Sequence, residues 1–382
     1  MISPLQSRRS MLNILFIQEP SVNSTEYHKL TKDDRFNVIK YILATDGSIT
    51  KESFIEFLMQ CNRDGVQING IFAGFPAFHP IGGLTQDIIE LPIFHENVKC
   101  IALCSRGINF VDLETLTKYN IELFHYDDSS SDSNIAINQV GNDVADCAMW
   151  HVLEGFRKFS LFMNETITTK HSIKSRQVIR DDGTTKFAFG HELNANQFVL
   201  SPRGQRALIL GMGSIGCLIA TKLQYGLGME IHYSKRGGPI KNDSWKYHPM
   251  DNLHEELYQF DAIVIALPGT TETFHLVDTT FLSKCKNDNL ILVNVGRASI
   301  FDMEAITQGL SKGQIRHLGM DVFTNEPLID SCLLDSRNKN KVTYTPHIGS
   351  GTKQVFDQST DLAITQLTRW LLPSDTSSSR SH

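Results

Sequence analysis

Residues 206–216, RALILGMGSIG, decide the fold class because they join a short apolar run to a glycine-rich turn. A continuous apolar run is typical of a strand buried on both faces of a parallel sheet. After the turn, apolar residues recur at helical spacing at Ile215, Leu218, Ile219 and Leu223. A strand, a G-x-G-x-x-G turn and a helix in this order predict a doubly wound α/β sheet that binds a dinucleotide.

Each glycine of this turn has a separate predicted task. Gly211 allows the tight turn, Gly213 lets the backbone approach a pyrophosphate, and Gly216 lets the helix pack closely on the strand. The free N–H groups and the dipole of the helix N-terminus favour a phosphate there. The predicted phosphate contacts are Gly211, Gly213, Ser214, Ile215 and Gly216.

Further strands can be recognised on both sides of this unit. The downstream β-rich runs are 229–233, 261–267, 289–295, 315–320 and 342–346. Upstream, runs at 11–17, 68–74, 98–105 and 121–126 alternate with helical stretches at 50–62 and 111–120. This β–α–β rhythm predicts parallel sheets with helices on their faces.

The length of 382 residues predicts two domains. A helix predicted over 143–160 and a polar, loop-rich stretch over 164–196 connect them. The expected fold class is α/β, with two Rossmann-like, doubly wound parallel-sheet domains and a cleft between them. Residues 1–141, completed by 347–382, form the expected substrate domain, and residues 142–346 form the expected dinucleotide-binding domain.

The composition excludes several classes of partner. With 41% hydrophobic and 20% charged residues, the chain is typical of soluble globular proteins. A net charge of -6 argues against nucleic acid, and no apolar run reaches the ~20 residues that span a bilayer. Seven cysteines without a CxxC pair or a zinc spacing predict reduced thiols in a cytoplasmic protein and no metal site. The acidic, serine-rich segment 127–134 is expected to be a loop, and the tail 377–382 a frayed end.

The end of the second strand of the nucleotide unit bears on the choice of cofactor. An NAD-binding unit has a carboxylate there for the ribose hydroxyls. This chain has Ser234, Lys235 and Arg236 instead. Two cations and a hydroxyl suit a 2′-phosphate, so NADP(H) is favoured over NAD(H). The alternative is that Lys235 and Arg236 are a solvated surface pair and that either cofactor is used.

Chemically versatile side chains follow the later strands. Arg297 comes after the run 289–295, Glu326 after 315–320, and His347 after 342–346. The carboxyl ends of parallel strands meet at one edge of a sheet, where ligands bind, so these side chains are expected to share a site. Further expected cofactor contacts at this edge are Pro268, Thr273, Val295, Asp321 and Gly349.

The joint pattern resembles the D-isomer-specific 2-hydroxyacid dehydrogenase family. The matching motifs are VNVGRASIFD with Arg297, GMDVFTNEPL with Asp321 and Glu326, and TPHIGS with His347. GMGSIG, SRGINFVDLETLTKYNI and NDVADCAMWHVLEGFRKF extend the resemblance upstream. The closest branch is that of the glyoxylate and hydroxypyruvate reductases, fungal members included. The resemblance implies an NAD(P)-dependent oxidoreductase that reduces a small 2-oxo acid to the D-2-hydroxy acid.

The chemistry of this reaction explains the residue types. A 2-oxo acid takes a hydride from a nicotinamide and a proton on the new alkoxide. His347 is the expected proton donor, and Glu326 the carboxylate that raises its pKa and orients its ring. Arg297 offers a planar fork for the substrate carboxylate and a donor for the carbonyl oxygen. The resemblance assigns the same three roles.

The first domain contributes expected substrate contacts. The resemblance points to the loop 105–108, with Arg106 and Gly107, as the segment whose backbone N–H groups bind the substrate carboxylate. The loop 75–78 is expected to shape the pocket, and its aromatic residues leave open a substrate bulkier than glyoxylate. Departures from the family pattern are Ala298 in place of glycine, Asp146 in place of glutamate, and the run 349–358.

Two alternatives remain open at this stage: a corepressor of the same fold, and a formate or phosphoglycerate dehydrogenase of the same superfamily. Corepressors of the same fold bind NAD(H) and turn over little substrate, although this chain has no extended low-complexity tail. A formate dehydrogenase would need a distinctive asparagine and NAD specificity. A phosphoglycerate dehydrogenase usually carries a regulatory domain, for which no residues remain after Arg369. The resemblance also implies a homodimer formed through the inter-domain helix and the arm after it.

Overall fold

The computed structural model describes residues 11–108, 110–126, 139–181, 183, 186–193, 197–286 and 288–372. The chain divides into two compact units. Unit 1 comprises Met1–Ile137 and Thr352–His382, and unit 2 comprises Asn138–Gly351. His347 therefore belongs to unit 2, whereas the sequence placed it in the returning segment. The expected loop 127–134 and tail 377–382 lie outside the described residues.

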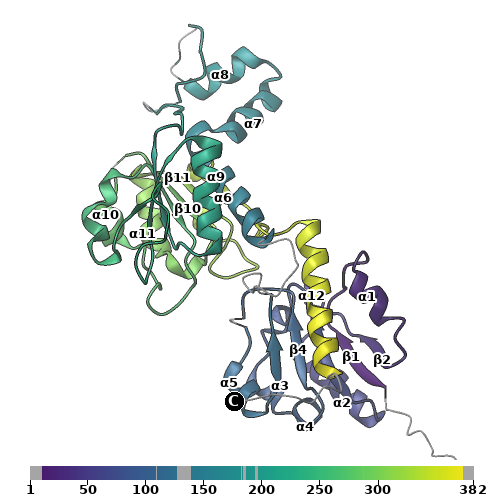
Figure 1. Cartoon of the computed structure of the whole chain (residues 1–382). Helices are drawn as coiled ribbons and strands as arrows, with labels where there is room; N and C mark the ends of the chain where they lie inside the picture. Colours follow the sequence, from purple (N-terminus) through teal and green to yellow (C-terminus); the bar gives the residue numbers. More distant parts are fainter. Residues whose placement is uncertain are drawn as a thin grey trace, which may run out of the picture. The chain divides into compact units, whose positions relative to one another are not determined.

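Unit 1 is a five-stranded parallel sheet in the order β2-β1-β3-β4-β5 (Figure 1). Its strands are β1 (Leu12–Phe16), β2 (Phe36–Lys40), β3 (Ile68–Ala73), β4 (Cys100–Leu103) and β5 (Glu122–Phe124). Its helices are α1 (Thr25–Leu30), α2 (Lys51–Arg63), α3 (Gln86–Ile89), α4 (Pro92–His95), α5 (Leu113–Lys118) and α12 (Lys353–Leu371). Buried residues of α2, α3 and α4 pack on one face, and those of α1 and α12 on the other.

Unit 2 is a seven-stranded sheet in the order β12-β11-β10-β9-β6-β7-β8, and all of its strand pairs are parallel. Its strands are β6 (Arg206–Leu210), β7 (Glu230–Ser234), β8 (Lys246–Tyr247), β9 (Ala262–Ile265), β10 (Leu290–Asn294), β11 (Ile315–Met320) and β12 (Val342–Tyr344). The order reverses between β6 and β9, which makes this the ligand-binding switch point of a doubly wound sheet. The predicted fold class is confirmed.

Helices cover both faces of this second sheet. The apolar side chains of α10 (Thr279–Lys284) and α11 (Met303–Ser311) pack on one face. Those of α6 (Gln139–Arg157) and α9 (Ser214–Leu227) pack on the other. Successive residues of each central strand alternate between these two cores, as the period of a strand requires. This is why the strands read as continuous apolar runs.

The expected loop-rich stretch 164–196 is only partly a loop. It contains most of α7 (Phe159–Thr169) and all of α8 (Ser172–Arg180). The amphipathic signal was weak because α7 buries no residue within the chain. In Figure 1 the two helices extend beyond the sheet of unit 2.

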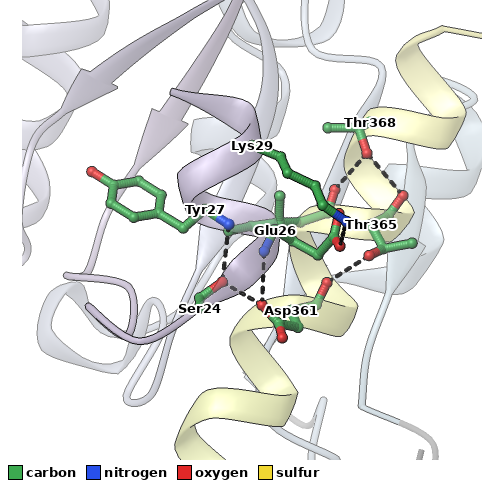
Figure 2. A network of polar contacts seen from close by, with 8 residues as sticks. Ser24, Glu26, Tyr27, Lys29, Asp361, Thr365 and Thr368 are labelled. Atoms are coloured by element: carbon green, nitrogen blue, oxygen red, sulfur yellow. Dashed lines mark hydrogen bonds and ion pairs between the residues drawn. The ribbon is translucent and has the colours of Figure 1, made fainter. Parts of the chain in front are cut away.

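Asp361 of the C-terminal helix α12 forms hydrogen bonds with the N-terminal end of α1 (Figure 2). Its Oδ1 accepts hydrogen bonds from the Ser24 hydroxyl and, at 3.1 Å, from the Glu26 backbone N–H. The Ser24 hydroxyl in turn accepts from the Tyr27 N–H at 2.9 Å and caps the helix. Caps of this kind typically contribute about 1 kcal/mol. The contact joins residues 337 positions apart, so it helps to return the chain to unit 1.

Candidate active site

The carboxyl edge of the unit 2 sheet collects the predicted residues of that unit. The glycine-rich turn follows β6, and Lys235 follows β7. Arg297 follows β10, Asp321 follows β11, and His347 follows β12. Because every strand pair is parallel, all of these positions lie at one edge.

The three glycines of the turn differ in what a side chain would meet. Gly211 has φ +99°, and a Cβ there would lie 2.6 Å from the Ala266 carbonyl oxygen. At Gly216 a Cβ would lie 2.0 Å from the Gly211 carbonyl oxygen, so helix α9 can approach only because this residue is glycine. These are the conformational reasons expected from the sequence.

Gly213 has a different environment, because a Cβ there would meet nothing within 4 Å. Its φ of -84° needs no glycine either. The protein itself therefore leaves this space open. Gly213 is also the N-cap of α9 and has no side-chain cap, so the backbone donors of Ser214 and Ile215 are not used by a capping side chain. The turn thus fits a phosphate-bearing cofactor.

The side chains after β7 are placed unequally. The Ser234 hydroxyl is buried, and among the described residues it has no hydrogen-bond partner, so the cofactor contact predicted for Ser234 stays a prediction. Lys235 is half-buried and Arg236 is exposed. Burial raises the pKa of the Cys217 thiol and the charge of Lys235 opposes this, which places Lys235 near the first turn of α9. Lys235 thus lies toward the N-terminal part of α9, whereas the phosphate contact predicted for Arg236 stays a prediction.

The loop after β9 is closed by one hydroxyl. Thr273 Oγ1 donates to the Pro268 carbonyl oxygen at 2.7 Å and accepts from the Thr270 N–H at 2.8 Å. Within the loop, Gly269 lies against Arg297, since a Cβ there would be 3.1 Å from the Arg297 Cγ. Val295, on the next strand end, is buried. Pro268 and Thr273 are thus brought together, and Thr273 shapes the loop.

His347 and Glu326 form the ion pair that the sequence predicted. His347 Nδ1 lies 2.8 Å from Glu326 Oε2, and the two side chains are 39% and 36% exposed. The other Glu326 oxygen accepts the Phe323 N–H at 3.0 Å, which orients the carboxylate. The hydrogen bond that His347 donates to Glu326 raises the pKa of His347, whereas burial and the charge of Arg297 lower it. The pair thus engages His347 through its Nδ1 atom.

Asp321 is buried and organises the loop that carries His347. Its carboxylate accepts the Thr345 hydroxyl at 2.5 Å, the Ile348 N–H at 3.0 Å and the Gly349 N–H at 2.8 Å. A Cβ at Gly349 would lie 2.7 Å from Asp321 Oδ2, so only glycine permits this approach. These bonds also explain why residues 347–351 stay with unit 2. The cofactor contact predicted for Asp321 stays a prediction, because its carboxylate already has three protein donors.

Arg297 is held by its own strand end. Asn294 Nδ2 donates to the Arg297 carbonyl oxygen at 3.0 Å, while Asn294 Oδ1 accepts the Gly296 N–H. The Arg297 side chain donates through Nη1 to the Gly296 carbonyl oxygen at 2.8 Å. Burial lowers the pKa of the guanidinium and Glu326 opposes this, so its charge is close enough to Glu326 to matter. The sequence reading had not singled out Asn294, although a buried polar residue at a strand end was a signal for it.

Unit 1 presents the remaining predicted residues at the carboxyl ends of its own strands. Arg106 and Gly107 follow β4 and are half-buried, and the Ser105 hydroxyl donates to the Gly107 carbonyl oxygen at 3.0 Å. After β3, Phe75 is 63% exposed whereas Ala77 and Phe78 are buried. Of the loop 75–78, only Phe75 and Pro76 are therefore available to shape a pocket.

The geometry of unit 2 defines a nucleotide-binding α/β protein with an acid–base pair at its ligand edge. Residues 168–349 match the family model described as D-isomer specific 2-hydroxyacid dehydrogenase, NAD binding domain. A Saccharomyces cerevisiae protein assigned by name to the 2-hydroxyacid dehydrogenases is 47% identical over 365 residues, 93% of each chain. The chain belongs to the D-isomer-specific 2-hydroxyacid dehydrogenase family, an oxidoreductase family with a nicotinamide cofactor.

Solved structures agree on the fold. A glyoxylate reductase from Paecilomyes thermophila has a TM-score of 0.73 at 21% identity, covering 94% of this chain and 95% of that one. The holo form of Rhodotorula graminis D-mandelate dehydrogenase has a TM-score of 0.75 at 20% identity, covering 94% of each chain. At these identities the likeness concerns the fold alone.

The described residues also bear on membranes and metals. No helix among them has the length and apolar character to span a membrane. Within the same residues, no group of three or more His, Cys, Asp or Glu side chains is placed to hold a metal ion.

The ion pair predicts that His347 titrates above its ordinary pKa of 6.5 and that Glu326→Gln lowers this pKa. Because the folded pKa is raised, the pair's stabilisation is fully present below about pH 6.5 and is lost as pH rises through the raised value. NMR titration of the histidine rings measures the shift. Glu304→Gln on α11 is the control and should leave His347 unchanged. An equal His347 pKa in wild type and Glu326→Gln would contradict the pairing.

Proposed function

We propose that the protein reduces a small 2-oxo acid of the glyoxylate or hydroxypyruvate type to its D-2-hydroxy acid, with NADPH as the favoured hydride donor. The observation that carries this proposal is the His347–Glu326 pair, which shares one sheet edge with Arg297 and with the open glycine turn. The resemblance of the chain's motifs to those of glyoxylate and hydroxypyruvate reductases supports the substrate class.

The residues of the chain divide the work of this reaction. A nicotinamide cofactor, with its pyrophosphate held by the glycine turn, would supply the hydride for the substrate carbonyl carbon. Protonated His347 donates its Nε2 proton to the developing alkoxide, while Glu326 stabilises the imidazolium through Nδ1. Arg297 binds the substrate carboxylate and polarises the carbonyl oxygen. The backbone around Arg106 and Gly107 is proposed to bind the carboxylate as well.

The preference among 2-oxo acids is proposed to depend on the loop 75–78 of unit 1. Phe75 offers an exposed aromatic ring, which favours an apolar substituent on the acid. A bulkier 2-oxo acid therefore belongs in any substrate panel beside glyoxylate and hydroxypyruvate.

The state of the cysteines supports a proposal on the cellular compartment of the protein. All seven are unpaired in the structure, which supports a reducing compartment and hence a cytoplasmic location.

A homodimer is proposed from the exposed face of α7. Phe159, Met163 and Ile167 recur every four residues and are 47%, 58% and 66% exposed, so they form one apolar stripe. Ile173 and Val178 of α8 continue the apolar surface. A second copy of the chain would cover it.

The reaction predicts that the purified chain consumes NADPH with at least one acid of the panel. His347→Ala should lower the rate by about 10²–10⁴, since it removes the general acid. Absorbance of the reduced nicotinamide measures this, and near-UV circular dichroism checks that the variant folds. Tight cofactor binding without turnover of any acid would instead favour a corepressor-like binding protein.

The cations after β7 predict the cofactor preference. Lys235→Ala combined with Arg236→Ala should weaken NADPH binding about tenfold or more and leave NADH nearly unchanged, because only NADPH carries the 2′-phosphate. Lys241→Ala, an exposed lysine of the same loop, is the control. Equal losses for both cofactors, or none, would sink the NADP(H) preference.

The apolar stripe predicts that Met163→Glu with Ile167→Glu yields a monomer. Sedimentation velocity measures the mass of wild type and variant. Tyr258→Glu, which changes a side chain 65% exposed elsewhere in unit 2, should leave the dimer intact. A monomeric wild type would refute this proposal.

A further inference from the structure

A chain of hydrogen bonds runs from Asp321 through the side of unit 2 that α6 covers. The Thr345 hydroxyl, which donates to Asp321, lies 3.2 Å from His151 Nε2. His151 Nδ1 lies 2.8 Å from the Thr343 hydroxyl, which lies 3.0 Å from His317 Nε2. His317 Nδ1 then lies 2.9 Å from Lys158 Nζ. Lys158 also donates to the Asn340 carbonyl oxygen at 3.0 Å.

The packing of α6 on β11 makes room for this chain. His151 lies on α6, and His317 on β11. A Cβ at Gly319 would lie 2.6 Å from the His151 Cβ, so glycine at this position admits the imidazole. His151, His317 and Lys158 are 0%, 1% and 4% exposed. A polar chain in such a place is tolerated only when every member has its partners.

Both histidines are neutral in this environment. Burial lowers the pKa of His151 to about 3. Burial, with the charge of Lys158 added, holds the pKa of His317 well below its ordinary value. A neutral imidazole has one donor and one acceptor nitrogen, which is what a link in a chain requires.

The chemistry of the ends sets the direction of every bond. Burial raises the pKa of Asp321, and its hydrogen bonds with Thr345, Gly349 and Ile348 oppose this. The ionised carboxylate only accepts, so Thr345 donates to it and accepts a hydrogen bond from His151 Nε2–H. His151 Nδ1 then accepts a hydrogen bond from the Thr343 hydroxyl, whose oxygen accepts a hydrogen bond from His317 Nε2–H. Burial lowers the pKa of Lys158 to about 7, but its amine keeps N–H donors whether or not it is charged, so His317 Nδ1 finally accepts from Lys158. The reverse direction would move one proton from Lys158 to Asp321 and weaken the charge-assisted bonds from Ile348 and Gly349.

We propose that His151 and His317 are positioning residues of the reaction, because the directed chain from Lys158 keeps Asp321 ionised and thereby places the loop that carries His347. This role rests on the proposed function, whereas the direction of the chain does not. His347 is affected in two ways, since Asp321 binds the backbone directly after it and adds to the larger effect of Glu326 in raising its pKa.

The charged groups around the chain are few among the described residues. Arg316, Lys341 and Glu154 act on Lys158, and Arg316 also acts on His317. Burial raises the pKa of the Cys147 thiol to about 11, and the thiol lies 3.6 Å from the Thr345 hydroxyl. It therefore stays protonated and can donate to the Thr345 hydroxyl beside the His151 donor, because a hydroxyl oxygen accepts two hydrogen bonds.

The direction can be read without any activity. In the full chain labelled with ¹⁵N-histidine, long-range ¹H–¹⁵N correlation spectra report which ring nitrogen carries the proton, and His151→Gln and His317→Gln assign the two rings. Both should be Nε2–H tautomers that do not titrate between about pH 5.5 and 8.5. A proton on Nδ1 of either ring, or titration in that range, would overturn the directed chain.

The positioning role is tested by two replacements of His151. Phenylalanine removes the donor, whereas glutamine places an amide N–H close to the former Nε2. We expect His151→Phe to lower kcat about tenfold or more, with little change in KM for NADPH, and His151→Gln to restore most of it. In His151→Phe the loss of activity at high pH should also begin at a lower pH, because the His347 pKa falls.

His232→Gln is the matched control, since His232 is 5% exposed and hydrogen-bonded to His248 in the same unit but lies outside the chain. Its pH profile should be that of wild type. A uniform loss of kcat in His151→Phe with an unmoved pH profile, or equal activity of the two His151 variants, would refute the positioning role. If wild type turns over no 2-oxo acid, the proposed reaction fails. The NMR pKa of His347 in both His151 variants then decides the positioning.

Discussion

The parallel pairing of all seven strands in unit 2 is the constraint on which the site depends. Parallel strands need a crossover after each strand, so every loop at one edge begins at a carboxyl end. The order β7-β6-β9 separates two of these loops at the switch point, where Gly216 lets α9 pack against the turn. Cofactor, acid–base pair and arginine can therefore share one edge although they are far apart in sequence.

Two carboxylates at this edge have opposite tasks because their surroundings differ. Glu326 is partly exposed and faces an imidazole, so its charge favours a protonated His347. Asp321 is buried and faces two backbone N–H groups and a hydroxyl, so it shapes the loop after β12. In the proposed reaction Glu326 raises the pKa of His347, and Asp321 holds the backbone directly after His347. The two residue types alone do not reveal this difference.

A structural feature can be predicted from this sequence when it depends on neighbouring residues, and it cannot when it depends on packing between distant segments. Runs such as 206–210 and 315–320 were recognised as strands because both of their faces are buried. The sequence pattern does not reveal the edge strand β2, because its burial is mixed. It predicts a loop where most of α7 lies, because the apolar side chains of α7 face solvent. The pairing of His347 with Glu326 was expected from family motifs. The chain through His151, His317 and Lys158 depends on how α6 packs on β11, which no local pattern encodes.

In the proposed reaction a hydride reaches C2 of a 2-oxo acid while His347 supplies the proton. The most direct test of this reaction is turnover of hydroxypyruvate with NADPH deuterated at C4, followed by mass and chiral analysis of the product. We expect a D-2-hydroxy acid with deuterium at C2 from one of the two C4 positions, and its near absence with His347→Ala. An L product, or a product without deuterium from either position, would contradict the proposed reaction.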